Sequence, residues 1–139
     1  MLEAISAREI AVSGLRAQRT RMNVIANNIA NALTPATVKG GAFRRQMAIL
    51  SGEQLQPMLE PEKFGVKVKE VLSDPSPLRQ VYDPHHPFAD ENGYVEYPNV
   101  DLSVEMVDLV SAQRAYEANV AVVLSGKRMS QKALEILQV

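Results

Sequence analysis

Apolar side chains recur at alternating steps of three and four residues along the last third of the chain, from about Asn99 onward. This spacing places the residues on one side of an α-helix, so it predicts a long helix with an apolar seam. The apolar members of the seam are Leu102, Met106, Leu109, Tyr116, Val120, Val123, Leu134 and Leu137. Gln113, Lys127 and Ser130 interrupt it. A seam of this kind requires a partner helix.

The same spacing occurs at the start of the chain and predicts a second amphipathic helix there. Its apolar members are Ile5, Val12, Leu15, Met22, Ala26, Ile29 and Leu33, and its polar exceptions are Arg8 and Arg19. Ser6 and Glu9 have the spacing of a capping box, which predicts that the helix begins near Ser6. Pro35 disfavours a helical residue before it, so the helix is expected to end at Leu33 or Thr34.

Asparagines recur every four residues within the first helix, at Asn23, Asn27 and Asn31, with Asn28 beside them. Asparagine is a weak helix former, so something other than local propensity must favour these positions. Two interpretations remain open: a solvated polar face, or a ladder of amides that hydrogen-bond to neighbouring chains.

Between the helices, from about Ala42 to Pro98, short runs alternate between apolar and polar residues and predict β-strands. Phe64, Val66 and Val68 alternate with Lys67 and Lys69. Weaker strand candidates span residues 43–50 and 78–82, and the pair at residues 92–93, Asn-Gly, predicts a hairpin turn. The segment at residues 51–63 shows no clear periodicity and is expected to be mobile.

These patterns predict an α+β fold with helices at residues 1–34 and 99–139 and a β-rich module at residues 35–98. The two helices are expected to pack as an antiparallel coiled coil, with the small antiparallel β module inserted between them. Two helices bury only one stripe each, so a large apolar surface is expected to stay exposed on a single copy. Gly126 inside the second helix predicts a close helix contact or a slight bend.

Composition removes several classes of function. The net charge is −1, which gives no electrostatic reason to expect binding to nucleic acid or acidic membranes. The clusters at residues 16–21 and 44–45 contain Arg16, Arg19, Arg21, Arg44 and Arg45, and are interpreted as ion-pair partners or solvated side chains. The chain has no cysteine, no apolar run long enough to cross a bilayer and no recognisable signal peptide.

The residues also offer little chemistry. His85 and His86 are adjacent and are interpreted as turn residues rather than metal ligands. Asp90, Asn92 and Gly93 resemble part of a calcium loop, but its remaining ligand positions are missing. No catalytic, cofactor-binding or metal-binding residues are therefore expected, and the chain is predicted not to be an enzyme.

Two terminal segments carry a family resemblance. SGLRAQRTRMNVIANNIANALT (residues 13–34) and NVDLSVEMVDLVSAQRAYEAN (residues 99–119) resemble the N- and C-terminal signatures of bacterial flagellar axial proteins. Between them, GGAFRRQ (40–46), GVKV (65–68) and the segment at residues 74–101 resemble the short subunits of the proximal rod in particular. The PATVK loop (35–39) departs from the more polar loop expected of the family.

The resemblance implies a structural subunit of the rod, the drive shaft of the flagellar basal body that crosses the periplasm. It implies export by the flagellar type III apparatus without signal cleavage. It also implies assembly with copies of itself and with the rod proteins FlgB, FlgF, FlgG and FliE, through the two helical seams together with Asn27 and Asn31.

Three alternatives stay open from the sequence. One is a different rod protein of the same family, similar to FlgB, FlgF or FlgG. Another is a periplasmic cell-wall hydrolase that uses the carboxylate pair Glu60 and Glu62. The third is a self-contained helical regulator that forms a closed dimer.

Overall fold

The computed structural model describes residues 2–36, 40–56 and 60–137. Its elements follow in the order α1 (Leu2–Asn31), β1 (Gln46–Gln56), β2 (Glu60–Ser73), β3 (Arg79–Tyr82), β4 (Tyr94–Tyr97) and α2 (Leu102–Leu137). Two long helices therefore enclose a β-rich segment, and the α+β fold expected from the sequence is confirmed. Part of the loop at residues 35–39 lies outside the described residues.

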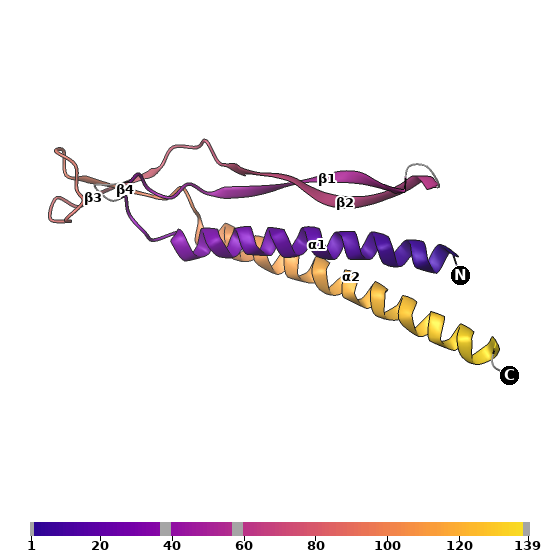
Figure 1. Ribbon diagram of the computed structural model, residues 1–139. Helices are drawn as coiled ribbons and strands as arrows, with labels where there is room; N and C mark the ends of the chain where they lie inside the picture. The colour runs from indigo at the N-terminus through magenta and orange to yellow at the C-terminus, as the bar shows by residue number, and fades with distance from the viewer. Residues whose placement is uncertain (1, 37–39, 57–59, 138–139) are drawn as a thin grey trace.

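The elements form three elongated layers, with α1 in the middle (Figure 1). The β1–β2 hairpin lies along one side of α1, and α2 runs antiparallel to α1 along another side. The two helix termini, Leu2 and Leu137, lie at one end of the molecule, and the small β3–β4 sheet lies at the other end. One end of the molecule is therefore made of helix and the hairpin tip, and the other end carries the β3–β4 sheet.

The α1 helix begins earlier and ends earlier than the sequence pattern predicted. It starts at Leu2, so the expected start near Ser6 is wrong, and Ser6 lies inside the helix. Residues 2–5 (Leu-Glu-Ala-Ile) are themselves helical. Ser6 therefore does not adopt the non-helical backbone conformation of an N-cap residue. At the other end the backbone N–H of Thr34 donates to the carbonyl of Asn31 (3.1 Å), which closes the last turn before Pro35.

The α2 helix starts at Leu102 because Asp101 caps it. The Asp101 carboxylate accepts hydrogen bonds from the backbone N–H groups of Ser103 (2.8 Å) and Val104 (3.3 Å). A carboxylate in this position satisfies donors that the first turn leaves free, and it is also favoured by the helix dipole.

The hairpin is longer than the sequence indicated. The β1 strand continues to Gln56 and β2 begins at Glu60, so the expectation of a mobile segment at residues 51–63 is wrong for the described part of it. Residues 57–59 lie outside the described residues. The strands pair over most of their length, with irregularities between Ile49 and Leu50 and between Gln54 and Gln56. A two-stranded ribbon is marginal alone, and packing along α1 supports it.

The β3–β4 pair is joined differently from the prediction. The connection runs through residues 83–93, so the Asn92-Gly93 pair is not a two-residue hairpin turn. Instead the Asp90 carboxylate accepts from the backbone N–H groups of Asn92 (2.9 Å) and Tyr94 (2.8 Å), and Gly93 adopts a positive φ of 82°. This short turn reverses the chain at the end of the 83–93 connection, so that β4 can pair with β3.

A glycine allows the hairpin to approach α1 closely. The Ser13 hydroxyl accepts from the backbone N–H of Val66 (3.0 Å) and donates to the carbonyl of Ile10 (2.6 Å). A Cβ atom at Gly65 would lie 2.6 Å from this hydroxyl and 2.9 Å from a methyl carbon of Leu55. The side of β2 that carries Gly65 therefore faces the helix, while Phe64, on the other side, is 56% exposed.

Replacing Gly65 with alanine is expected to lower the free energy of unfolding by about 1–3 kcal/mol, because the pinned Ser13 hydroxyl leaves no room for a methyl group. Chemical denaturation would measure the loss. Gly52→Ala is the matched control, since a Cβ atom there would meet only the Phe64 ring at 4.0 Å. Equal losses in the two variants would show that close packing at Gly65 is not the cause.

The core of a single copy is thin. Among the described residues, the buried apolar side chains are Ala11, Ala17, Ile25, Ala32, Val95, Val100 and Ala112. Four of these seven are alanines, so they contribute little apolar surface to folding. Many larger apolar side chains on α2 remain exposed, including Val107 at 70%. The chain therefore leaves more apolar surface uncovered than an ordinary monomer does.

Candidate assembly surface

A buried carboxylate joins the three layers near the start of α2. Glu105 is fully buried, and it accepts hydrogen bonds from Arg45 Nε (2.6 Å) and Asn28 Nδ2 (3.0 Å). Asn28, also buried, exchanges hydrogen bonds with the backbone of Gln46, donating at 2.8 Å and accepting at 2.9 Å. One residue from each helix and two from the hairpin region are thus fixed together. We call Asn28, Arg45, Gln46 and Glu105 the polar joint.

Further polar contacts extend the joint toward the β3–β4 end. Asn99 Oδ1 accepts from the backbone N–H of Arg45 (2.8 Å), and the Arg45 guanidinium also lies 3.5 Å from Asp108 and 3.9 Å from Asp74. Asp108 in turn forms an ion pair with Arg21 of α1 (3.4 Å). Of the arginines in the two clusters, Arg45 and Arg21 form ion pairs, whereas Arg16, Arg19 and Arg44 are exposed, so each of the two interpretations of the sequence holds for part of the set.

Asp74 is stabilised in its charged form. Hydrogen bonds from the Ser76 hydroxyl (2.5 Å) and the Ser76 backbone N–H (2.9 Å) lower the pKa of Asp74, and the positive charges of Arg45 and Arg44 lower it further. A depressed folded-state pKa stabilises the fold above the ordinary value of 3.8, and this contribution disappears as the pH falls through the lowered pKa.

Ser76→Ala is expected to raise the pKa of Asp74 toward its ordinary value, because the largest cause of the depression is the hydroxyl hydrogen bond. A carboxyl-detected NMR titration would measure the pKa directly. Ser73→Ala, three positions earlier, serves as the control and is expected to leave the titration of Asp74 unchanged. An unaltered Asp74 pKa in the Ser76 variant would contradict this assignment.

Small and polar residues of α2 face α1. Glu105, Ala112 and Gly126 are the buried residues of this helix, and they recur at steps that keep them on one side. Asn119 belongs to the same row and lies against Gly14 of α1, where an added Cβ atom would approach it to 2.9 Å. Gly126 therefore lies on the row that packs toward α1, which fits the close-contact interpretation of this glycine.

The residues of the predicted seams are placed unevenly. On α2, Leu102, Leu109, Tyr116, Val120 and Val123 are half-buried, whereas Met106, Gln113, Leu134 and Leu137 are exposed. On α1, Val12, Leu15, Met22, Ile29 and Asn31 are half-buried and Asn27 is exposed; Leu33, which follows the end of α1, is also exposed. The side chain of Ile5 lies outside the described part. Their role in assembly stays a prediction.

Three of the four asparagines of α1 have hydrogen-bond partners within the chain. Asn31 donates to the carbonyl (2.8 Å) and the side-chain oxygen (3.0 Å) of Asn27, and Asn27 donates to the Gln46 side chain (3.2 Å). Asn28 belongs to the polar joint, and Asn23 is exposed. Sequence reasoning missed the structural importance of Asn28, because the partners that bury it come from segments far along the chain.

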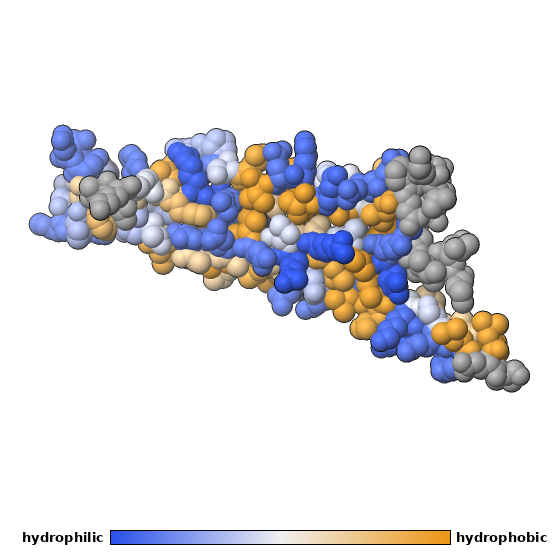
Figure 2. Space-filling model, viewed as in Figure 1, coloured by the Kyte–Doolittle hydropathy of each residue, from blue (hydrophilic) through white to orange (hydrophobic). Residues whose placement is uncertain are grey.

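A second set of apolar residues lies on the exposed side of α2, separated by 3, 4, 7 or 11 residues, each close to a whole number of helical turns. We call it the outer stripe; it consists of Val104, Val107, Ala118, Val122, Met129 and Ile136, all exposed. Figure 2 shows apolar patches over α2, interrupted by polar side chains, and further apolar patches over part of the hairpin. An adjacent row at steps of seven residues, Arg114, Ala121 and Arg128, carries two positive charges, and we call it the polar strip. The outer stripe is the surface that a partner would cover.

The remaining candidates from the sequence lie in the loop between β3 and β4 or at the start of β2. Pro84 and His85 lie in a turn, and His86 Nδ1 accepts from the backbone N–H of Phe88 (3.2 Å), which supports the interpretation of this segment as a turn. Glu60 and Glu62 belong to β2, but their side chains are outside the described part. In the described ranges no three ligand-type side chains cluster to hold a metal, and no helix is suited to cross a membrane.

An elongated chain with a thin core and many exposed apolar side chains along α2 has the features of a structural subunit that completes its packing by assembly. Two family models match its ends: "Flagella basal body rod protein" over residues 9–35 and "Flagellar basal body rod FlgEFG protein C-terminal" over residues 91–136.

Full-length relatives identify the family more closely. The flagellar basal-body rod protein FlgC of Borreliella burgdorferi is 46% identical over 143 residues, which cover 93% of this chain and 94% of the relative. FlgC of Bacillus subtilis is 41% identical, with 97% and 99% covered, and FlgC of Salmonella typhimurium is 40% identical, with 94% and 95% covered. The chain belongs to the FlgC family of flagellar basal-body rod proteins, which are structural proteins and not enzymes.

Proposed function

We propose that this chain polymerises through its two helices into the proximal rod, and that the assembled rod transmits torque from the motor to the hook. The observation that carries the proposal is the contrast between the alanine-rich core and the large exposed side chains of the outer stripe. Neighbouring subunits would complete the core that one copy lacks. The predicted seam residues that are exposed, such as Met106 and Leu134, would contribute to the same contacts.

The polar joint suits a shaft that must resist shear. Because it connects α1, α2 and the hairpin through buried, charge-assisted hydrogen bonds, a load applied to either helix passes directly to the other layers. The hairpin covers one side of α1 and leaves α2 open along its length (Figure 1). In the rod, the helices would therefore form the wall and the β elements would lie outside it.

The partners follow from the family. Copies of this chain and the rod proteins FlgB, FlgF, FlgG and FliE would supply the neighbouring helices, and the flagellar export apparatus would deliver the chain to the periplasmic space without signal cleavage. The FlgC relatives are basal-body rod proteins, which supports a place for this chain in the rod; the individual partners and the export route are what the family resemblance implies. The hydrolase alternative receives no support from the relatives.

The test is complementation in the bacterium that carries this chain. Deleting its gene is expected to abolish swimming and the formation of rods beyond the base, and restoring the full chain is expected to recover both. Isolated basal bodies from the complemented strain should contain the chain and cross-link it to other rod subunits. Normal rods in the deletion strain, or absence of the chain from isolated basal bodies, would refute the proposal.

A further inference from the structure

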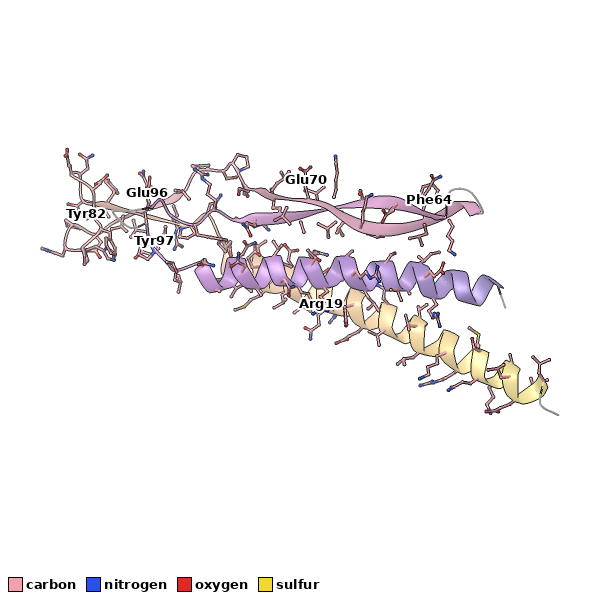
Figure 3. The ribbon with its side chains drawn as sticks, in the orientation of Figure 1. Arg19, Phe64, Glu70, Tyr82, Glu96 and Tyr97 are labelled. Carbon is pink, nitrogen blue, oxygen red and sulfur yellow. The ribbon has the colours of Figure 1, made fainter. Side chains whose placement is uncertain are left out.

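The β3–β4 sheet presents an exposed aromatic face at one end of the molecule. The strand register places Tyr82 opposite Tyr94 and Gln80 opposite Glu96, so these four side chains share a face. Tyr82 is 65% exposed and Tyr94 is 42% exposed, whereas Val95 on the other face is fully buried. We call Gln80, Tyr82, Tyr94 and Glu96 the tyrosine face. Figure 3 shows Tyr82 and Glu96 at the end of the molecule opposite the start of α1 and the end of α2.

The two tyrosine rings are already arranged for contact. Their centroids lie 5.3 Å apart in an edge-to-face geometry, a favourable arrangement for aromatic pairs. Gly93 keeps the ring of Tyr82 close to the turn, since a Cβ atom there would lie 3.0 Å from that ring. Exposed aromatic side chains held in this way lose little conformational entropy on binding, so they are efficient anchors for a partner.

The opposite end of the molecule has complementary chemistry. Two contacts define the register of the antiparallel helices: Asn28 contacts Glu105, and Gly14 lies against Asn119. Moving from the first contact to the second covers the same number of residues on each helix. Extending this register to the start of α1 places Leu2 opposite residue 131. Residues 132–137 of α2 therefore extend beyond α1, as Figure 1 shows. Within this extension Ile136 is 76% exposed.

Two cations precede this extension. Lys127 and Arg128 are exposed, and they form no ion pair with any residue in the described part of the chain. We call residues 127–137 the α2 end. It combines apolar side chains with the unpaired positive charges of Lys127 and Arg128 and an internal ion pair between Lys132 and Glu135 (2.7 Å). The tyrosine face combines aromatic side chains with the carboxylate of Glu96.

We infer that the tyrosine face binds the α2 end of a second copy of this chain. Apolar side chains of the helix cover the tyrosine rings, and Arg128 lies over a ring or pairs with Glu96. Because the two surfaces lie at opposite ends of the molecule, the contact is head-to-tail, and repeating it produces an open, polar row rather than a closed dimer. This inference rests on the proposed assembly into the rod.

Disulfide trapping tests the contact directly, because the natural chain contains no cysteine. A strain that expresses a tagged Tyr82→Cys chain together with an Ile136→Cys chain is expected to yield an intermolecular disulfide in isolated basal bodies. The control pair combines Phe64→Cys with Ile136→Cys, since Phe64 is similarly exposed but belongs to the hairpin. We expect little or no disulfide from this control pair.

Charge exchange gives a second measurement that does not depend on cysteine geometry. Glu96→Arg and Arg128→Glu, each alone, are expected to lower the recovery of cross-linked neighbouring copies about tenfold, and the double variant is expected to restore it. Glu70→Arg, an exposed glutamate of β2, is the matched control and should have little effect.

Rods that contain the chain but show neither the disulfide nor rescue by charge exchange would overturn the head-to-tail contact and leave the proposed function intact. A disulfide between the Tyr82→Cys chain and a different protein would also overturn it, because the tyrosine face would then bind a partner other than a second copy of this chain. Absence of the unsubstituted chain from rods would instead refute the proposed function itself.

Discussion

Replacing Arg45 with methionine is expected to lower the free energy of unfolding by about 3–5 kcal/mol. The Glu105 carboxylate is fully buried, and it depends on the Arg45 guanidinium for its ion pair and its shortest hydrogen bond (2.6 Å). Methionine preserves much of the apolar stem but leaves the buried charge with only the amide of Asn28. Urea denaturation followed by far-ultraviolet circular dichroism would measure the loss.

The adjacent arginine provides a matched control. Arg44 is exposed and donates to backbone carbonyls of Asp74 (3.4 Å) and Ser76 (3.0 Å), so Arg44→Met is expected to cost no more than about 1 kcal/mol. Adding Glu105→Leu to Arg45→Met should recover part of the lost stability, because the unpaired buried charge is removed. Similar losses for the two arginine variants would contradict the assigned role of the polar joint.

Replacing Ala118 with aspartate is expected to block rod assembly and motility while leaving the isolated chain folded. Ala118 lies in the outer stripe and is exposed in a single copy, so the substitution should change the stability of the monomer by less than about 0.5 kcal/mol. In the rod the same carboxylate would be buried without a partner, which costs roughly 3–5 kcal/mol at each contact. Swimming assays and counts of complete basal bodies measure the outcome.

Ala121→Asp is the control for this prediction. Ala121 is the same residue type, is also exposed, and lies three positions away on the polar strip of α2. We expect this variant to swim and to build rods at nearly the normal level. If Ala118→Asp also assembles normally, the outer stripe is not an interface.

The spacing of apolar residues was enough to predict the helices, the α+β class and the inserted β module. It could not identify the row of α2 that packs on α1. Hydrophobic spacing favours Met106 and Leu134, but the fold places Ala112 and Gly126 inside because small side chains allow the helices to approach closely. Glu105 can lie in the same buried row because Arg45 neutralises its charge and Arg45 and Asn28 donate hydrogen bonds to its carboxylate. Spacing along one helix cannot predict these partners, because they come from other segments.

The β elements illustrate the same limit. The alternation around Val66 correctly indicated a strand, yet the strands extend to Gln56 and from Glu60 because they pair with each other and lie along α1. Neither interaction is local in the sequence. The Asn92-Gly93 pair was a sound turn signal, but its strand partner lies beyond an intervening loop, so turn chemistry alone could not give the connection.

Cysteine labelling at Val107 would test most directly whether neighbouring copies cover the outer stripe. In the monomer, Val107→Cys and the control Glu70→Cys should both react readily with a maleimide, since both positions are exposed. In purified rods we predict that labelling at position 107 slows by more than about tenfold while labelling at position 70 is nearly unchanged. Equal labelling of position 107 in monomer and rod would contradict the account.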